Sequence, residues 1–153
     1  MGNRRALIQM SQSELEEFLA KRHSMTLATR GTDQDIHLVA MWYGFLNGQL
    51  AFWTYAKSQK VVNLKRCNSI AILVETGSSY QELCGVQIVG DAEIIEEPSI
   101  VLEIGRSIYD RYVSDDSDVV QTPFMATAPK RVGVIIHPRK TISWDHHKLK
   151  GLY

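Results

Sequence analysis

Most apolar residues of this chain fall in short runs or alternate with polar residues, which is the pattern of β-strands rather than helices. Asn47-Gly48, between two such runs, is a strong signal for a β-hairpin turn. Gly85 and Gly90 interrupt another run, and glycines inside a strand predict a bulge or a close approach of a second backbone. The predicted strands cover residues 25–29, 36–46, 49–55, 70–75, 82–95 and 131–136, with residues 141–144 as an extension of the last.

Helical spacing of apolar residues is limited to three segments. Ser11 and Glu14 form a capping-box pattern at the start of the first helix, which ends near residues 21–22. Residues 58–66 form a short second helix, and a third begins at Pro98 and ends near residue 112. Residues 114–118 are a polar loop, and the tail, residues 145–153, has no periodicity of its own.

The order of these elements predicts a mainly β fold, an antiparallel β-barrel with peripheral helices. Strands and helices do not alternate as they do around a parallel sheet, and no GxGxxG motif indicates a Rossmann fold. A length of 153 residues is typical of a single domain that can bury a core of its own. We therefore expect residues 1–153 to form a single binding domain.

The composition is that of an ordinary globular protein, with 44% hydrophobic and 22% charged residues. No apolar run is long enough to cross a membrane, and the first residues do not read as a secretion signal. Cys67 and Cys84 lie far apart without a CxxC spacing, so we expect both thiols to be reduced and the protein to be cytoplasmic. A net charge of zero argues against a nucleic-acid partner.

The charges are nevertheless unevenly distributed. Residues 36–74 contain no Asp or Glu, whereas residues 91–118 are strongly acidic. A local basic patch in a neutral protein fits a small anionic ligand. The alternative is that these side chains only solvate one face of the second helix. The cations of the first segment are Lys57, Lys60, Lys65 and Arg66.

The most informative segment covers residues 52–60, in which an aromatic strand passes directly into a helix. The first N–H groups of a helix have no partner within the helix, and the helix dipole adds partial positive charge there. Ser58, Lys57 and Lys60 add a hydroxyl and two ammonium groups at the same point. The segment therefore predicts a phosphate site beside an aromatic surface on which a flat ring can lie.

Further segments place this site in a known arrangement. Residues 52–60 fit the pattern F-x-T-x-x-x-S-x-K. In the proteins that share this pattern it is followed by a helix and a strand, which residues 62–68 and 71–74 resemble. Residues 85–93 resemble a later long strand of the same proteins, which ends in G-x-A-x. In this order and spacing the chain resembles the pyridoxamine 5′-phosphate oxidase-like split-barrel superfamily, which binds flavin or the deazaflavin F420. The resemblance implies an FMN-binding split barrel of six antiparallel strands in a Greek-key order. It also implies a homodimer with two equivalent cofactor sites between the subunits.

The departures from the family pattern indicate which cofactor to expect. Flavin-dependent oxidases of the superfamily carry an R-x-V-L-L-K strand, whose basic positions correspond here to His37 and Trp42. A neutral imidazole cannot replace a guanidinium fork on a phosphate dianion. Residues 37–43, 52–60 and 143–149 instead resemble the F420-binding branch of the superfamily. F420 carries a phosphodiester and a glutamate tail, for which the cations of residues 57–66 form a possible track; FMN is the alternative cofactor.

The resemblance also implies which residues hold the cofactor. Those around Met41 and Trp53 are expected at the ring, and those around Lys60 at the phosphate. Trp144 is expected at the site of the neighbouring subunit; the alternative is that it belongs to a C-terminal tail that only docks on the fold. For Trp42 and Trp53, ordinary packing in the barrel core is the alternative. The expected cofactor-binding residues are Val39, Met41, Trp42, Trp53, Thr54, Tyr55, Lys57, Ser58, Gln59, Lys60 and Trp144.

The predicted chemistry is hydride transfer by the cofactor to an unsaturated small molecule, so no nucleophile–base pair is expected and the catalytic residues are unknown. Adjacent His146 and His147 have no further ligand pattern around them, and we predict no metal site. Two function classes remain open: an F420- or FMN-dependent oxidoreductase, and a non-catalytic protein that binds F420 or haem.

Overall fold

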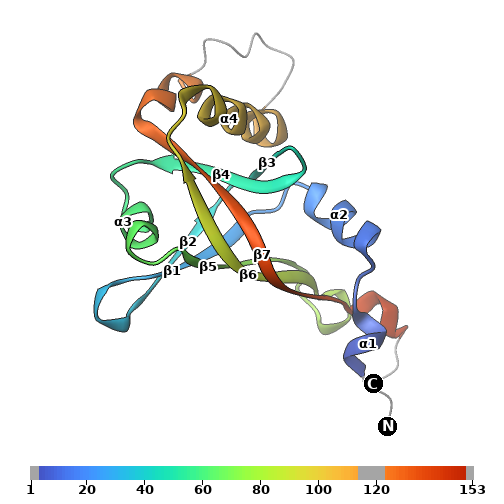
Figure 1. Ribbon diagram of the computed structural model, residues 1–153. Helices are drawn as coiled ribbons and strands as arrows, with labels where there is room; N and C mark the ends of the chain where they lie inside the picture. Colours follow the sequence, from blue (N-terminus) through green and yellow to red (C-terminus); the bar gives the residue numbers. More distant parts are fainter. Residues whose placement is uncertain (1–3, 114–122, 151–153) are drawn as a thin grey trace.

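The computed structural model describes residues 4–113 and 123–150, which form a curled antiparallel sheet with helices around it (Figure 1). The predicted strands and the three predicted helices are all present. In chain order the elements are α1 (Arg4–Ile8), α2 (Gln12–Ala20), β1 (Met25–Arg30), β2 (Ile36–Met41), β3 (Gly44–Leu46), β4 (Gln49–Tyr55), α3 (Gln59–Arg66), β5 (Ser69–Thr76), β6 (Cys84–Ile95), α4 (Pro98–Tyr112) and β7 (Arg131–Asp145), with short 3₁₀ turns at Thr32–Gln34, Tyr80–Glu82, Met125–Lys130 and His146–Leu149.

The seven strands follow the order β2-β1-β5-β6-β7-β4-β3, so the two edge strands of the sheet are consecutive in the chain. β2 ends at Met41 and β3 begins at Gly44. Because two residues join the edges, the sheet curls until these edges come close together, which gives the predicted split barrel. The sequence predicted residues 36–46 as one strand; the structure bends this run at Trp42 and Tyr43, and counting it once gives the six expected strands.

The longest strands cross the molecule and carry the predicted irregularity. β7 pairs with β6 along its length and with β4 through Arg131–Ile135. The predicted extension at residues 141–144 belongs to the same continuous strand. The register shifts between Val89 and Gly90, where a Cβ on Gly90 would lie 2.2 Å from the carbonyl oxygen of His137. The glycine therefore permits the close backbone approach at the bulge.

Two apolar clusters flank the sheet. One fills the barrel and contains Leu27, Phe52 and Ile72, all almost completely buried. The other lies between the outer face of β4 and α4 and contains Trp53 and Ile104. α4 approaches the sheet closely because it has a glycine at position 105, where a Cβ would lie 2.4 Å from the Trp53 ring. The tryptophan is thus held in place from the side opposite the barrel interior.

α2 begins with the predicted capping box, in which Ser11 and Glu14 each bond to the other's backbone N–H. Its C-terminal end is held by Arg111 of α4. That guanidinium donates to the carbonyl oxygens of Leu19, Ala20 and Lys21, and its carbon atom lies 4.7 Å from the centre of the Tyr43 ring. One side chain therefore satisfies the carbonyl groups at the helix end and joins α2 to α4.

Cys67 and Cys84 are both free thiols, and burial raises the pKa of Cys84 to about 11, so that this thiol is protonated and inert at neutral pH. Within residues 4–113 and 123–150, no helix is long and apolar enough to span a membrane.

Replacing Arg111 should destabilise the protein through the α2–α4 joint. We expect Arg111→Ala to lower the free energy of unfolding by about 2–3 kcal/mol, because the carbonyl groups at the end of α2 lose charge-assisted donors. Urea denaturation followed by tryptophan fluorescence measures this loss. Arg106→Ala, on an exposed position of the same helix, is the control and should change the unfolding free energy by less than about 0.5 kcal/mol. Equal losses in the two variants would contradict the proposed joint.

His23 predicts a pH dependence of stability. Burial lowers the pKa of His23 below its ordinary value of 6.5, and the nearby charges of Lys21 and Arg111 lower it further. The folded protein favours the neutral ring of His23. The contribution of this residue to the free energy of unfolding is therefore complete above about pH 6.5, and it is lost as the pH falls from there towards the folded-state pKa. Wild-type stability should therefore fall more steeply below pH 6.5 than that of His23→Gln, measured by urea denaturation. Parallel curves would contradict this role of the histidine.

Candidate functional site

The turn from β4 into α3 gathers the polar side chains that the sequence predicted for an anion site. Ser58 is the N-cap residue of α3, yet its hydroxyl caps no backbone group of the helix. That hydroxyl instead lies 3.4 Å from the Thr54 hydroxyl, to which Lys60 Nζ donates a hydrogen bond of 3.1 Å. Two hydroxyls and an ammonium group therefore stand together beside the positive end of a helix.

A second cation, Arg131 at the start of β7, lies close to Lys60. Burial lowers the pKa of Lys60, and repulsion from Arg131 lowers it further. Burial also lowers the pKa of Arg131. None of the ion pairs in the described part of the chain involves either residue. Two half-buried cations without a carboxylate partner among these residues are costly for a fold and favourable for an anionic ligand.

The Arg131 side chain is held firmly in place. Its guanidinium carbon lies 4.6 Å from the centre of the Trp53 ring and 4.2 Å from that of Tyr55, and its Nε donates to the Thr127 hydroxyl over 2.7 Å. From the sequence alone, Arg131 is predicted only as the start of a strand. It reaches the site because it pairs with Tyr55 across β7 and β4, and this register joins residues 76 positions apart in the chain.

A chain of amide and hydroxyl groups that leads into the protein interior supports the start of α3. Gln59 Nε2 donates to Asn63 Oδ1 over 2.8 Å, and Asn63 Nδ2 donates to the Thr29 hydroxyl over 3.0 Å. Asn63 is completely buried. The Gln59 side chain, which the sequence predicted as a cofactor ligand, thus has a supporting bond within the helix.

The four predicted cations do not form one continuous track. Lys57 is exposed next to the anion site, and Lys60 lies within it. Lys65 pairs with Glu96 at 3.4 Å, and Arg66 donates to the carbonyl oxygen of Arg30. Of the four predicted cations, Lys60 and Lys57 therefore stand near the first turn of α3, whereas Lys65 and Arg66 do not.

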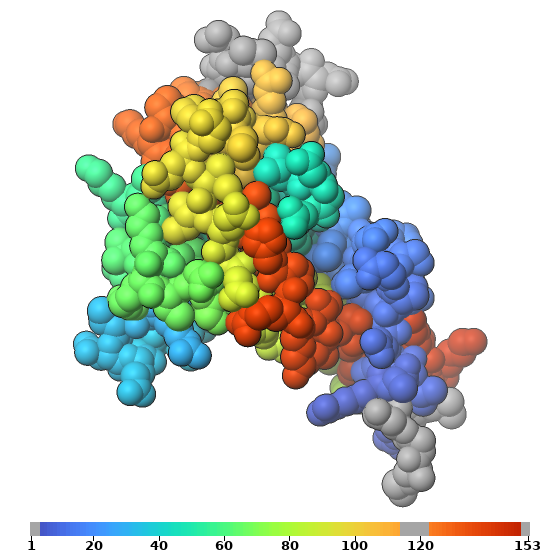
Figure 2. All heavy atoms as spheres, in the orientation of Figure 1, coloured from blue at the N-terminus to red at the C-terminus, as the bar shows by residue number. Residues whose placement is uncertain are grey.

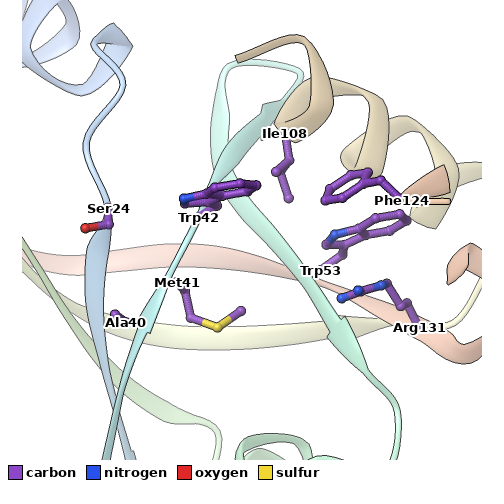
Figure 3. Close-up of a pocket in the computed structure, with 8 residues that line it drawn as sticks. All are labelled: Ser24, Ala40, Met41, Trp42, Trp53, Ile108, Phe124 and Arg131. Atoms are coloured by element: carbon purple, nitrogen blue, oxygen red, sulfur yellow. The ribbon is translucent and has the colours of Figure 1, made fainter. Parts of the chain in front are cut away.

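Beside the anion site lies a cavity of about 320 Å³ with mostly aromatic and aliphatic walls. Figure 3 shows Met41 and Trp42 on one side of it, and Trp53, Phe124 and Arg131 on the other. Trp42 stacks almost parallel on Tyr112, with ring centres 4.8 Å apart. Ala40, Ser24 and Ile108 complete the lining. A slot between aromatic walls is the shape that a flat ring system requires.

The cavity lies in the split of the barrel, where two strand edges have no strand neighbour among the described residues. β2 pairs with β1 only, and β3 follows β4 no further than Ala51. Residues 52–55 of β4 therefore pair with β7 alone. Backbone N–H and C=O groups along both edges are therefore available to bond to a ligand.

Two residues of β2, Val39 and His37, do not line the open cavity. Val39 packs against the core cluster, as Met41 does in part. His37 pairs with Thr29, whose hydroxyl binds Asn63, so this imidazole lies near the supporting chain below the anion site. Its Nδ1 atom is buried, with no hydrogen-bond partner in the described part of the chain.

Trp144 does not line the cavity of its own protomer. It lies near the C-terminal end of β7, whereas Arg131 begins that strand. Its ring packs on Gly85, where a Cβ would lie 2.5 Å from the indole. The expected place of Trp144 at the site of a neighbouring subunit stays a prediction. The nearby histidines are engaged locally, His146 with Tyr80 and His147 with Asp145, and no cluster suited to a metal ion occurs among the described residues.

Comparisons with known proteins agree with this architecture. A family model described as pyridoxamine 5′-phosphate oxidase matches residues 11–145. A conserved hypothetical protein from Mycobacterium tuberculosis is 42% identical in sequence, with a TM-score of 0.90 over 97% of this chain and 92% of that one. No curated protein gives a significant match.

Two further solved structures bear on the choice of ligand. An F420 reductase is 25% identical, with a TM-score of 0.63 over 82% of this chain and 94% of that one. The haem storage protein HutZ from Vibrio cholerae shares 10% of its sequence, with a TM-score of 0.67 over 86% of this chain and 94% of that one. The second likeness is one of fold alone.

Proposed function

The chain belongs to the pyridoxamine 5′-phosphate oxidase family, and from this premise we propose that it is an oxidoreductase that binds the deazaflavin F420 in the split of its barrel and reduces or oxidises an unsaturated small molecule. The observation that carries the proposal is the pair of half-buried cations, Lys60 and Arg131, beside the aromatic cavity. The residues fit a ligand that joins a flat ring to an anion.

The charge of the phosphate group supports F420 over FMN. A phosphodiester, as in F420, carries one negative charge, whereas the phosphomonoester of FMN is close to a dianion at neutral pH. Lys60 and the N–H groups of α3 suffice for one charge. The one polar side chain of β2, Ile36–Met41, is that of His37, an imidazole rather than a guanidinium. The 25% identity with an F420 reductase points in the same direction.

The protein's part in the reaction is binding, orientation and exclusion of water. Lys60 and Ser58 would hold the phosphate, and Trp42 and Trp53 would lie along the ring. The free edges of β2 and β4 would bond to the polar rim of the ring. When bound, the deazaflavin supplies two-electron hydride chemistry. The other class, a carrier that holds F420 or haem without turnover, uses the same cavity and differs only in the absence of a productive substrate.

We also propose that the protein is a homodimer. Large apolar side chains are exposed on the outward face of β2 and at the residue that follows the strand. Ile36 is 68% accessible, Leu38 63% and Trp42 46%. Such a row on an edge strand is a surface that monomeric proteins avoid. A second copy packed here would stand next to the cavity. In that arrangement Trp144 of one subunit can close the site of the other, as expected from the resemblance.

Removing the Lys60 ammonium should weaken cofactor binding. We expect Lys60→Ala to lower the affinity for F420 by about 1.5–3 kcal/mol, or roughly 10- to 150-fold, the range for a charge-assisted contact. Titration of the purified protein, followed by cofactor fluorescence, measures this. Lys65→Ala is the matched control, because Lys65 lies on the same helix and pairs with Glu96. Parallel titrations with FMN and haem test the alternatives, and tight FMN binding would overturn the choice of F420.

A charge on the β2 face should separate the subunits. Leu38→Asp is expected to shift the protein from dimer to monomer in light scattering at micromolar concentration, since a buried carboxylate without a partner is strongly disfavoured. Leu102→Asp, at a partly exposed position of α4, is the control and should leave the dimer intact. A monomeric wild-type protein would contradict the dimer and the predicted role of Trp144.

A further inference from the structure

Arg131 contributes the only charged side chain among the described residues that line the aromatic cavity. It stands on the wall formed by Trp53 and Phe124, opposite Met41 and Trp42 (Figure 3). A guanidinium has five N–H donors, and the Nε group of Arg131 is used by Thr127. The terminal N–H groups remain to donate to the Tyr55 hydroxyl and to a ligand.

The two cations of the site have different surroundings. Lys60 is bonded to Thr54 at the first turn of α3, where a phosphate would lie. The guanidinium of Arg131 lies over the rings of Trp53 and Tyr55, and contact with both rings limits its movement. A cation held between aromatic rings at the border of a flat cavity is suited to the polar edge of the ring rather than to a flexible phosphate.

We propose that Arg131 binds the carbonyl-bearing pyrimidine edge of the cofactor ring and favours the ring form that carries negative charge on that edge. This inference rests on the proposed deazaflavin function and specifies how the same site acts on the ring. A cation a few ångströms from an acid stabilises its conjugate base, so binding lowers the pKa of the ring. Such a charge is one of the ways in which proteins tune a cofactor.

The experiment follows the ionisation of the bound ring by absorbance. Two probes are titrated with acid and base in complex with the protein: F420, and the deazaflavin alcohol that has the same ring but no phosphate. With wild-type protein, we expect the midpoint of ring ionisation to lie at least about one pH unit below that of the free ring. Arg131→Gln should return the midpoint to the value of the free ring, and Arg131→Lys should retain part of the shift.

Matched variants separate this role from phosphate binding and from folding. Lys60→Ala should weaken binding of F420 but keep the full shift in the midpoint of ring ionisation. Thr127→Val leaves the charge of Arg131 in place but removes the bond to Nε, and it should reduce the shift. If Arg131→Gln does not fold, the reduced shifts of Arg131→Lys and Thr127→Val carry the test.

The outcomes distinguish the two proposals. The role of Arg131 is overturned if the shift in the ionisation midpoint persists in Arg131→Gln. It is also overturned if Lys60→Ala loses the shift to the same extent as Arg131→Gln does. Binding of both probes without any shift in the wild-type protein also overturns it while leaving the proposed F420 function standing. Failure of the wild-type protein to bind either probe removes the proposed function, and the inference with it.

Discussion

The joining of the two sheet edges by Trp42 and Tyr43 is the constraint on which the rest of this structure depends. β2 and β3 occupy opposite ends of the strand order, and two residues connect them. The sheet must therefore close on itself, but the bend keeps β2 away from β4. Tyr43, completely buried, fills the inside of the bend, and Trp42 is left on its outer side. A single local turn thus produces both the barrel and the opening in it.

The opening is useful because different parts of the chain arrive at it with complementary chemistry. β4 supplies Trp53 and passes into the first turn of α3, so an aromatic wall and a helix N-terminus are adjacent by connectivity. β7 adds Arg131 through its register with β4. α4 covers the back of Trp53 and stacks Tyr112 on Trp42. The slot and its charges are therefore positioned by rigid elements rather than by long loops.

The sequence was most informative where signals are local. Ser11 and Glu14, Asn47-Gly48 and the Phe52–Lys60 motif predicted a helix start, a turn and an anion site because each depends on neighbouring residues. Arg131 could not be recognised, since its place next to Tyr55 depends on the pairing of distant strands. Lys65 was grouped with Lys60 by sequence, but Glu96 of a later segment lies beside it in the fold. Long-range register and charge pairing are the information that a single sequence does not display.

The unpaired cations finally connect stability with function. Desolvation lowers the pKa of both Lys60 and Arg131, which means that the folded chain holds each of them charged at a cost. Folding alone would favour a carboxylate or an apolar side chain at these positions. Thr54, Thr127 and two aromatic rings provide partial compensation and keep the side chains in place. A ligand that brings negative charge to both cations removes the remaining cost, so the same charges that weaken the free fold become the source of its affinity.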